Sequence, residues 1–420
     1  MNLSLLDVSS LAVDRLERPA TFAVILRSTR SSERWNLERL REGARIAMRE
    51  FPRSACCVDG TEWIVGSTEP EITELTVADL EEQQREAESF VSGVITPTHA
   101  PLLRQRLIRE RKSGSVLLAT QMHHALGDGI ALVLWLSCQM RGTPVLGSRR
   151  KLSNPSGGDG LRLRQAAQPN GKKPKWKMTQ SLCRPMARST RSAQKCWKTL
   201  FLDENELRAV ITGRKLGITL NDLGCAIIFR SLREWLGTTS RPLSLWMPLS
   251  LRRDPFSGFG NASSRIRVLE PQGDGTWIDY AKQVRAQIEH ALGSGQWDLG
   301  RSADPIKKTA RWVGRIQARV LRLLLKMFFA RPGMDPCTTA FSFGSRVSAI
   351  DDAEAFPDVE TLETVGHLYS AHPFAFSAGG FGGRMAITFF WDPAQLEPTE
   401  ACRLFELLSD ASQAALKELQ

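Results

Sequence analysis

A chain of 420 residues, 42% of them hydrophobic and 24% charged, is long enough for two to three domains and too apolar to be disordered as a whole. The formal charge of +11 favours anionic partners, but no recognisable nucleic-acid-binding module accompanies it, so we expect no nucleic acid partner. The eight cysteines are scattered without a C-x2-C pair, which indicates reduced thiols and argues against a zinc site; we expect no metal.

No secretion signal and no membrane span are predicted. The first residues lack a positively charged segment and place Asp7 inside a short apolar stretch. No run reaches about 18 uncharged apolar residues. We therefore expect a cytoplasmic protein, and we leave peripheral membrane association open.

Strand and helix signals alternate along both halves of the chain, which predicts an α/β fold. The strands are predicted over residues 21–26, 62–65, 116–120, 243–247 and 386–391. The helices are predicted over residues 37–50, 80–90, 204–216, 221–236, 280–292 and 398–419, with a further buried helix starting after Gly129. Asp203 is a plausible N-cap for the helix that begins at Glu204.

A basic tract rich in glycine and proline separates the two halves. Residues 146–198 are predicted as a linker, and the tract at 149–198, which includes Lys195 and Lys198, holds almost no acidic residue before Asp203. Its simplest interpretation is a solvated linker. The alternative is a surface for anionic lipid headgroups, at about 1 kcal/mol per Lys or Arg near the membrane.

Residues 312–329 have the pattern of a basic amphipathic helix. Apolar residues recur at spacings of three and four, and four basic residues occupy the gaps. Such a helix lies either at a membrane interface or against a sheet, and the sequence favours neither.

The most informative motif is His123-His124-Ala125-Leu126-Gly127-Asp128-Gly129, which fits HHxxxDG after an apolar strand. An imidazole with an ordinary pKa of about 6.5 can take a proton at neutral pH and pass it on, so His124 is a candidate base. Asp128 could orient a ring or pair with an arginine, and Gly129 removes a side chain where a substrate approaches closely. The alternative is a packed histidine pair followed by an ordinary Asp-Gly turn.

The motif resembles that of acyl-CoA-dependent acyltransferases and peptide-synthetase condensation domains. Further segments resemble, in order and over most of the chain, the wax ester synthase / diacylglycerol acyltransferase family. They are LSLLDVSSLAVD (3–14), residues 97–108 and 115–129, ITLNDLGCAIIFRSLREWL (218–236), LWMPLSLRRD (245–254) and Gly260-Asn261. The chain departs from the family with Leu5 in place of proline, Ser10 in place of an aromatic residue and Leu103 in place of tryptophan.

The resemblance implies two similar condensation-like subdomains, each a mixed sheet flanked by helices, around a central tunnel. Their expected bounds are residues 1–145, with the HHxxxDG motif, and residues 199–420. It also implies that His124 is the general base of an O-acyltransferase that moves a fatty acyl group from CoA to a hydrophobic alcohol or diacylglycerol, without an acyl-enzyme. His123 is then a supporting or packing residue, and Asp128 is structural, with Arg252 as its expected partner.

Four further residues match family motifs and are expected to bind substrate or support the site. Asn221 and Asp222 belong to the T-x-N-D motif, Ser250 belongs with Arg252 to P-x-S-x-R, and Asn261 belongs to the G-N pair. Asn221 and Asn261 could shape the tunnel or stabilise the oxyanion; otherwise Asn221 caps a helix and Gly260-Asn261 forms a turn. We expect no cofactor, because acyl-CoA is a co-substrate. The phosphates of acyl-CoA are a third candidate partner of the basic tract, beside solvent and lipid headgroups.

The family's loop in the second half is replaced here by Thr338 to Ser345, TTAFSFGS, where only the glycine and a small polar character remain. This departure keeps a second hypothesis open: an acyltransferase of natural-product biosynthesis that uses a CoA or carrier-protein thioester and a specialised hydroxyl or amine acceptor. A third is a non-catalytic lipid-binding protein of the same fold.

Overall fold

The computed structural model describes the residues that build two sheets and their helices. They are Asp7, Ser10, Leu11, Leu182, Arg252, Phe356 and residues 20–60, 62–67, 69–145, 194–237, 241–250, 259–273, 275–294, 337–344, 358–368 and 372–420. The expected amphipathic helix at 312–329 and most of the basic tract lie outside the described residues.

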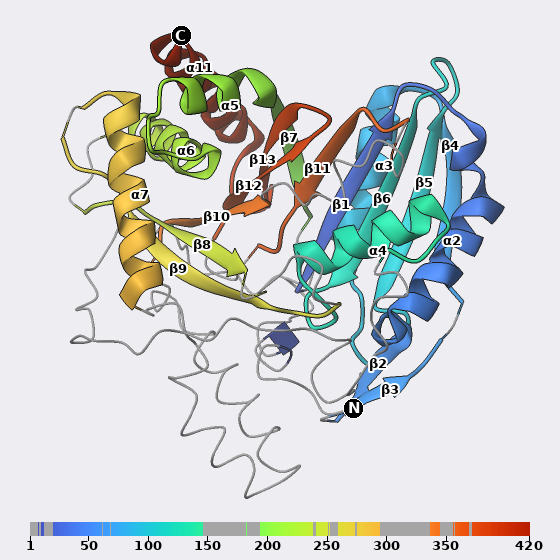
Figure 1. Ribbon diagram of the computed structural model, residues 1–420. Helices are drawn as coiled ribbons and strands as arrows, with labels where there is room; N and C mark the ends of the chain where they lie inside the picture. The colour runs from blue at the N-terminus through green and yellow to red at the C-terminus, as the bar shows by residue number, and fades with distance from the viewer. Residues whose placement is uncertain are drawn as a thin grey trace, which may run out of the picture.

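The first sheet has five strands in the order β11-β1-β6-β5-β4. Their bounds are β1 Thr21–Ser28, β4 Glu71–Val77, β5 Leu103–Glu110, β6 Val116–His123 and β11 Thr361–Val365. Helices α2 (Leu37–Glu50) and α4 (Gly129–Arg141) cover one face, and α3 (Leu80–Ser92) covers the other (Figure 1). Alternate residues of β1 therefore enter two different cores, which explains why the whole strand is apolar.

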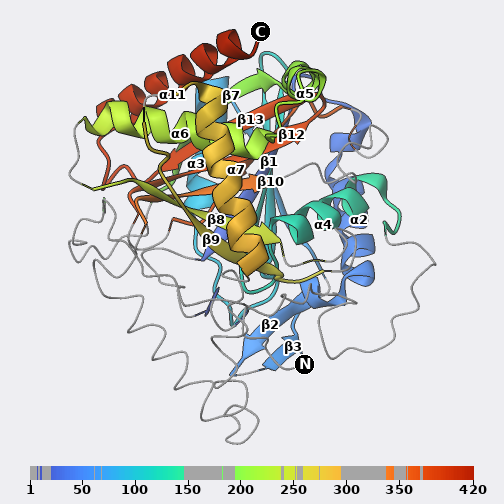
Figure 2. The ribbon, with the colours of Figure 1, turned by 60° about the vertical axis from the view of Figure 1, so that its left-hand side comes forward.

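The second sheet has six strands in the order β7-β13-β12-β10-β8-β9. Their bounds are β7 Cys196–Asp203, β8 Ser244–Ser250, β9 Ser263–Leu269, β10 Thr339–Gly344, β12 Phe374–Phe381 and β13 Arg384–Trp391. The helices α5 (Glu204–Gly213), α6 (Leu220–Leu236), α7 (Trp277–Ser294) and α11 (Pro398–Leu419) pack on its outer face (Figure 2). A small hairpin of β2 (Cys56–Asp59) and β3 (Glu62–Val65), with the 3-10 helices η1 (Glu33–Trp35) and η2 (Pro52–Ala55), completes the first half.

Strand β11 crosses from the second half of the chain into the first sheet. It pairs antiparallel with β1, with Ala23 opposite Val365 and Arg27 opposite Thr361. A third apolar core lies between the halves and joins Ile25 and Phe90 of the first to Trp197 and Phe390 of the second. The expected division into residues 1–145, a linker at 146–198 and residues 199–420 stays a prediction. Strand β11 pairs with the first sheet although it comes from the second half, and β7 begins at Cys196, within the expected linker.

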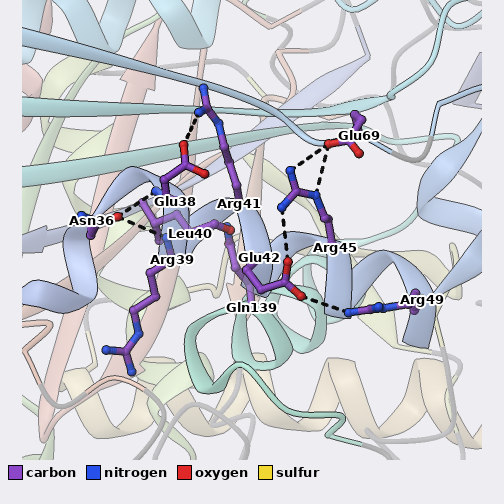
Figure 3. Close-up of polar contacts among 10 residues, drawn as sticks. All are labelled: Asn36, Glu38, Arg39, Leu40, Arg41, Glu42, Arg45, Arg49, Glu69 and Gln139. Carbon is purple, nitrogen blue, oxygen red and sulfur yellow. Dashed lines mark hydrogen bonds and ion pairs between the residues drawn. The ribbon is translucent and has the colours of Figure 1, made fainter.

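The outer face of α2 is polar, and its inner face approaches α4 closely. Asn36 caps the helix by accepting from the backbone N–H of Glu38 at 2.9 Å, and arginine–glutamate pairs follow along the exposed side (Figure 3). On the buried side, Gln139 Nε2 donates to the Leu40 carbonyl at 3.0 Å. A Cβ on Gly43 would lie 2.1 Å from the Gln139 carbonyl oxygen, so this helix contact requires glycine.

The predicted helices and strands within the described residues are present, but strands β2, β4, β5, β7, β9, β10, β11 and β12 were not predicted. The predicted N-cap Asp203 accepts from the Glu206 backbone N–H at 2.8 Å. Asn221, by contrast, does not cap α6: Thr219 is the N-cap and forms a capping box with Asp222. The segment beginning at Thr338 was expected as a loop, but Thr339–Gly344 is strand β10, paired in parallel with β8 and β12.

Candidate active site

The HHxxxDG motif occupies the connection between β6 and α4. Strand β6 is buried along its whole length and ends at His123, which lies opposite Thr21 of β1. The chain then turns, and Asp128 caps α4 by accepting from the Ala131 backbone N–H at 3.0 Å. A strand end and a helix N-terminus therefore fix the two ends of this loop (Figure 1).

His123 is a fully buried residue that supports the turn. Its side chain is 0% exposed, and Nδ1 accepts from the Ala125 backbone N–H at 3.1 Å. An accepting Nδ1 carries no proton in the neutral ring, so the proton is on Nε2. This ring contributes to the shape of the loop, and its supporting role in the reaction stays a prediction.

His124 is the partly exposed residue of the pair. Its backbone N–H donates to the Ala20 carbonyl at 2.7 Å, and its ring lies 4.4 Å from the ring of Phe22, centroid to centroid. Burial, then the neighbouring His123, then the charge of Lys195 lower the pKa of His124 to about 3, against a smaller raising effect from a hydrogen bond to the Gly127 backbone. At neutral pH this imidazole is uncharged and can accept a proton.

Asp128 and Arg252 form a buried ion pair between the two halves of the chain, as expected from the sequence. Arg252 Nη2 donates to Asp128 Oδ1 at 2.8 Å and to the Gly260 carbonyl at 2.7 Å. Asp128 Oδ2 accepts from the Ala262 backbone N–H at 2.9 Å. The carboxylate thus joins the motif to Arg252 and Ala262. Ser250 supports the arginine by accepting from its backbone N–H at 3.3 Å.

Asn261 holds the backbone of His124, the candidate base. Its amide nitrogen donates to the His124 carbonyl and to Ser10 Oγ, both at 3.0 Å. Its oxygen accepts from the Ser263 hydroxyl at 3.0 Å. Since both amide hydrogens are engaged by the protein, the geometry assigns Asn261 to loop support and leaves it no hydrogen for an oxyanion.

A second buried ion pair, which the sequence analysis did not single out, supports the other side of the loop. Arg53 of η2 pairs with Asp7 at 2.6 Å and donates from Nη2 to the Ala125 carbonyl at 3.1 Å. Trp63 Nε1 donates to Asp7 Oδ2 at 3.3 Å, and the Arg53 guanidinium lies over the Trp63 ring. Asp7 belongs to the opening LSLLD segment, so that segment contacts the site through Arg53.

The two glycines of the motif have different surroundings. A Cβ on Gly127 would lie 2.8 Å from the Ala131 Cβ and 3.1 Å from the Met122 Cε, so packing requires glycine there. Gly129 is exposed, and a Cβ at this position would meet nothing within 4 Å. The open space beside Gly129 lies at the N-terminus of α4, directly after the loop that carries His124.

The comparisons with known proteins agree on the architecture. The sequence matches no family model and none of the curated proteins. Among solved structures, the wax ester synthase/diacylglycerol acyltransferase from Marinobacter aquaeolei VT8 has a TM-score of 0.60 at 11% identity and covers 100% of both chains. The first condensation domain of the CDA synthetase has a TM-score of 0.66 at 12% identity, covering 98% of this chain and 95% of that one. The starter condensation domain of rhizomide synthetase, in complex with C8-CoA and Leu-SNAC, has a TM-score of 0.60 at 12% identity over 99% and 95%.

This chain has the condensation-like acyltransferase fold. At such low identity the likeness establishes the architecture and leaves substrates open. Within this fold, every helix that the structure describes is too short or too polar to cross a membrane. In the same described residues, no three His, Cys, Asp or Glu side chains come together as a metal site would need.

Asn221 and Asp222, which the sequence predicts to bind substrate or support the site, belong to α6. Their contacts within the described part of the chain do not include the HHxxxDG loop. Asn221 Nδ2 contacts Met247 Sδ at 3.9 Å. Asp222 is fully buried and accepts from both the backbone and the hydroxyl of Thr219 at 2.7 Å. The structure therefore gives Asp222 a capping role and places Asn221 in the packing of α6 on β8.

Lys195 was expected in a solvent-facing basic tract, and the structure corrects this. It directly precedes β7, is 1% exposed, and donates from Nζ to the Thr21 carbonyl at 2.9 Å and to Thr21 Oγ1 at 3.3 Å. Burial lowers the pKa of Lys195 to about 7. Within a run of basic residues, nothing in the sequence distinguishes a buried lysine; Lys198, three residues on, is exposed.

Proposed function

We propose that the chain is an acyltransferase that moves an acyl group from a thioester to a hydroxyl acceptor, with His124 as general base. The observation that carries the proposal is an uncharged, partly exposed imidazole held on a loop that two buried ion pairs fix in place. A base must be unprotonated and must keep its position, and this loop provides both conditions.

In the proposed reaction, the acceptor oxygen attacks the thioester carbonyl carbon while its proton passes to His124. The hydrogen bond to the Gly127 backbone raises the pKa of His124, so one ring nitrogen donates this bond. The other ring nitrogen is left to accept the proton of the acceptor hydroxyl. The tetrahedral intermediate then collapses, the carbon–sulfur bond breaks, and the proton passes from His124 to the leaving thiolate. No acyl-enzyme and no cofactor take part, because both substrates meet beside one base.

For the donor we propose acyl-CoA, and for the acceptor a hydrophobic alcohol or a diacylglycerol. Two structures of the same fold support this choice: one is named a wax ester synthase/diacylglycerol acyltransferase, and the other is a complex with C8-CoA. Association with an anionic membrane surface stays a prediction, since the segments that suggested it lie outside the described residues.

A second candidate is an acyltransferase of natural-product biosynthesis with a carrier-protein thioester and a specialised hydroxyl or amine acceptor. The similarity to condensation domains of peptide and polyketide synthetases supports it. So does the segment from Thr338, which departs from the wax ester synthase pattern and forms a strand inside the second sheet.

The test is free-thiol release from palmitoyl-CoA with a long-chain alcohol, a diacylglycerol or a small polar alcohol as acceptor. We expect acceptor-dependent release that His124→Ala lowers by about 10²–10⁴-fold, the usual contribution of a positioned base. His99→Ala is the matched control, because His99 is an exposed histidine outside the site, and it should retain the wild-type rate.

Near-normal release by folded His124→Ala would contradict the mechanism. Silence of the wild type across all acceptors, followed by turnover with an acyl carrier protein thioester, would select the second candidate. Binding of acyl-CoA without turnover from either donor would select a non-catalytic lipid-binding protein.

A further inference from the structure

Phe22 of β1 packs against the imidazole of His124, the proposed base. The centroids of the two rings lie 4.4 Å apart, and the ring planes make an angle of 38°. At this short separation, a tilt closer to stacked than to edge-on turns the face of the phenyl ring towards the imidazole. Phe22 is 6% exposed and belongs to the first apolar core, so little water reaches this side of the base.

The register of the first sheet brings the two rings together. Phe22 lies opposite Met122, which precedes His124 by two residues. The His124 backbone N–H donates to the Ala20 carbonyl at 2.7 Å, which continues the antiparallel ladder beyond the end of β6. Side chains two residues apart along a strand share a face, so His124 emerges on the face that carries Met122 and Phe22.

The His124 ring must carry a positive charge for part of the proposed reaction. It becomes an imidazolium when it takes the proton of the acceptor hydroxyl, since its other nitrogen already carries a hydrogen. Burial, then His123, then the charge of Lys195 lower the pKa of His124 and so oppose that charge. A group that stabilises the imidazolium therefore lowers the barrier to transfer.

The carboxylate of the motif does not offer this stabilisation, because Asp128 is held by Arg252 at 2.8 Å. Among the described residues, the contacts of the His124 ring are the Gly127 backbone, which holds one nitrogen, and the ring of Phe22. An aromatic face attracts a cation within about 6 Å of its centre, most strongly where water is excluded. The Phe22 ring meets both conditions.

We propose that Phe22 is a positioning residue of the transfer reaction: its ring fixes the plane of the His124 imidazole and stabilises the imidazolium that forms as the acceptor oxygen bonds to the thioester carbon. This inference rests on the proposed function. The proton leaves His124 for the thiolate when the carbon–sulfur bond breaks, and the ring becomes neutral again. A saturated side chain would fill the core at this position but present no aromatic face to the cation.

The test replaces Phe22, in the full chain, with phenylalanines that carry one, two or three fluorine atoms. Fluorine withdraws electrons from the ring face and weakens its attraction for a cation, while the ring stays nearly the same size. The first readout is the rate at which diethyl pyrocarbonate modifies His124 at neutral pH, followed by peptide mass spectrometry. In that reaction the free nitrogen bonds to a carbonyl carbon and the imidazole becomes positively charged, as it does in the transfer. We expect the His124 rate to fall with each added fluorine, by about 10-fold at three, while the rate at exposed His99 stays constant.

Phe376 is the matched site for the same fluorine series. It is a buried ring of the second core and packs against the rings of Phe374 and Phe389, so its fluorination should leave the His124 rate unchanged. Phe22→Leu, which removes the aromatic face, should slow the reaction of His124 at least as much as three fluorine atoms do. Phe22→Tyr keeps that face and should keep most of the rate. If the variant with three fluorine atoms does not fold, the order of the other two carries the test.

The second readout is thiol release from palmitoyl-CoA. Here kcat should fall in the same order with KM nearly unchanged, because Phe22 acts on the charged base and not on the bound thioester. A constant His124 rate across the folded members of the Phe22 series would overturn the proposal, as would an equal fall in the Phe376 series. Because diethyl pyrocarbonate reacts without turnover, a wild type that releases no thiol would contradict the proposed function and leave the measured effect of Phe22 on His124 intact.

Discussion

The polar groups of the loop between His123 and Asp128 serve mainly to hold the loop itself. His123 accepts from the Ala125 backbone, and the Asp128 carboxylate accepts from Ala131, Ala262 and Arg252. Of the two histidines, His124 is the one that retains exposure. The division of roles between two adjacent histidines therefore follows from which of them the backbone uses.

Asp128→Asn should lower both stability and activity. The substitution removes the charge that neutralises buried Arg252, and breaking a buried pair in this way costs about 3–5 kcal/mol. Urea unfolding gives the stability change, and thiol release gives the activity change. Glu289→Gln is the control, because it breaks an exposed pair with Arg285 and should cost no more than about 0.5 kcal/mol. A loss of activity at unchanged stability would show that Asp128 acts on the substrate.

At the scale of elements, the start of α4 gives a test of where the donor approaches. Gly129→Ala adds a methyl group into open space at a helix N-terminus, so we expect stability to change by less than about 1 kcal/mol. If the thioester passes beside this position, KM for the donor should rise several-fold while kcat changes little. Steady-state kinetics with palmitoyl-CoA measure both constants.

Gly127→Ala is the matched variant on the same loop. Its added Cβ would press on Ala131 and Met122, so it should lower the melting temperature, in contrast to Gly129→Ala. A Gly129→Ala enzyme with wild-type kinetics would show that the donor does not approach α4 at this point.

Local signals predicted those elements whose stability is decided locally. The amphipathic helix α11 was predicted with its exact observed bounds, Pro398–Leu419, and Asp203 was predicted as the cap of α5. Capping of α6 by Asn221 was one of two alternatives; Asn221 and Thr219 are both favourable N-cap residues, and the capping box with Asp222 decides for Thr219.

Of the described strands, β1, β3, β6, β8 and β13 were predicted and the others were not. Strand β11 is five residues long and obtains its partner β1 from more than 330 residues away along the chain, so no nearby pattern reveals it. Strand β10 lies between β8 and β12 and lacks a regular alternation of polar and apolar residues. Arg53 and Lys195 were missed for a related reason: their roles arise from contacts with Asp7 and Thr21, which tertiary structure alone brings near.

At the scale of the whole molecule, the two sheets are joined by more than the chain connection. Glu363 of β11 pairs with Arg27 of β1, and its carboxylate accepts from Trp197 Nε1 at 3.0 Å and from Thr199 Oγ1 at 2.8 Å on β7. One buried carboxylate thus contacts both sheets. Trp197, which donates to this carboxylate, belongs to the apolar core between the halves.

We therefore expect the two sheets to unfold together. In pulsed hydrogen exchange across a urea series, amides of β5 and β6 should lose protection at the same urea concentration as amides of β12 and β13, because the core between the halves and the β11 pairing are lost in one step. Glu363→Gln should lower both midpoints equally, since it leaves the two sheets joined but weakens the contact they share. Glu360→Gln is the control on the same segment: Glu360 is exposed and accepts from Thr29, so the substitution should leave both midpoints nearly unchanged. Two separate midpoints in the wild type would mean that each half is stable without the other, and that the crossing of β11 does not couple them.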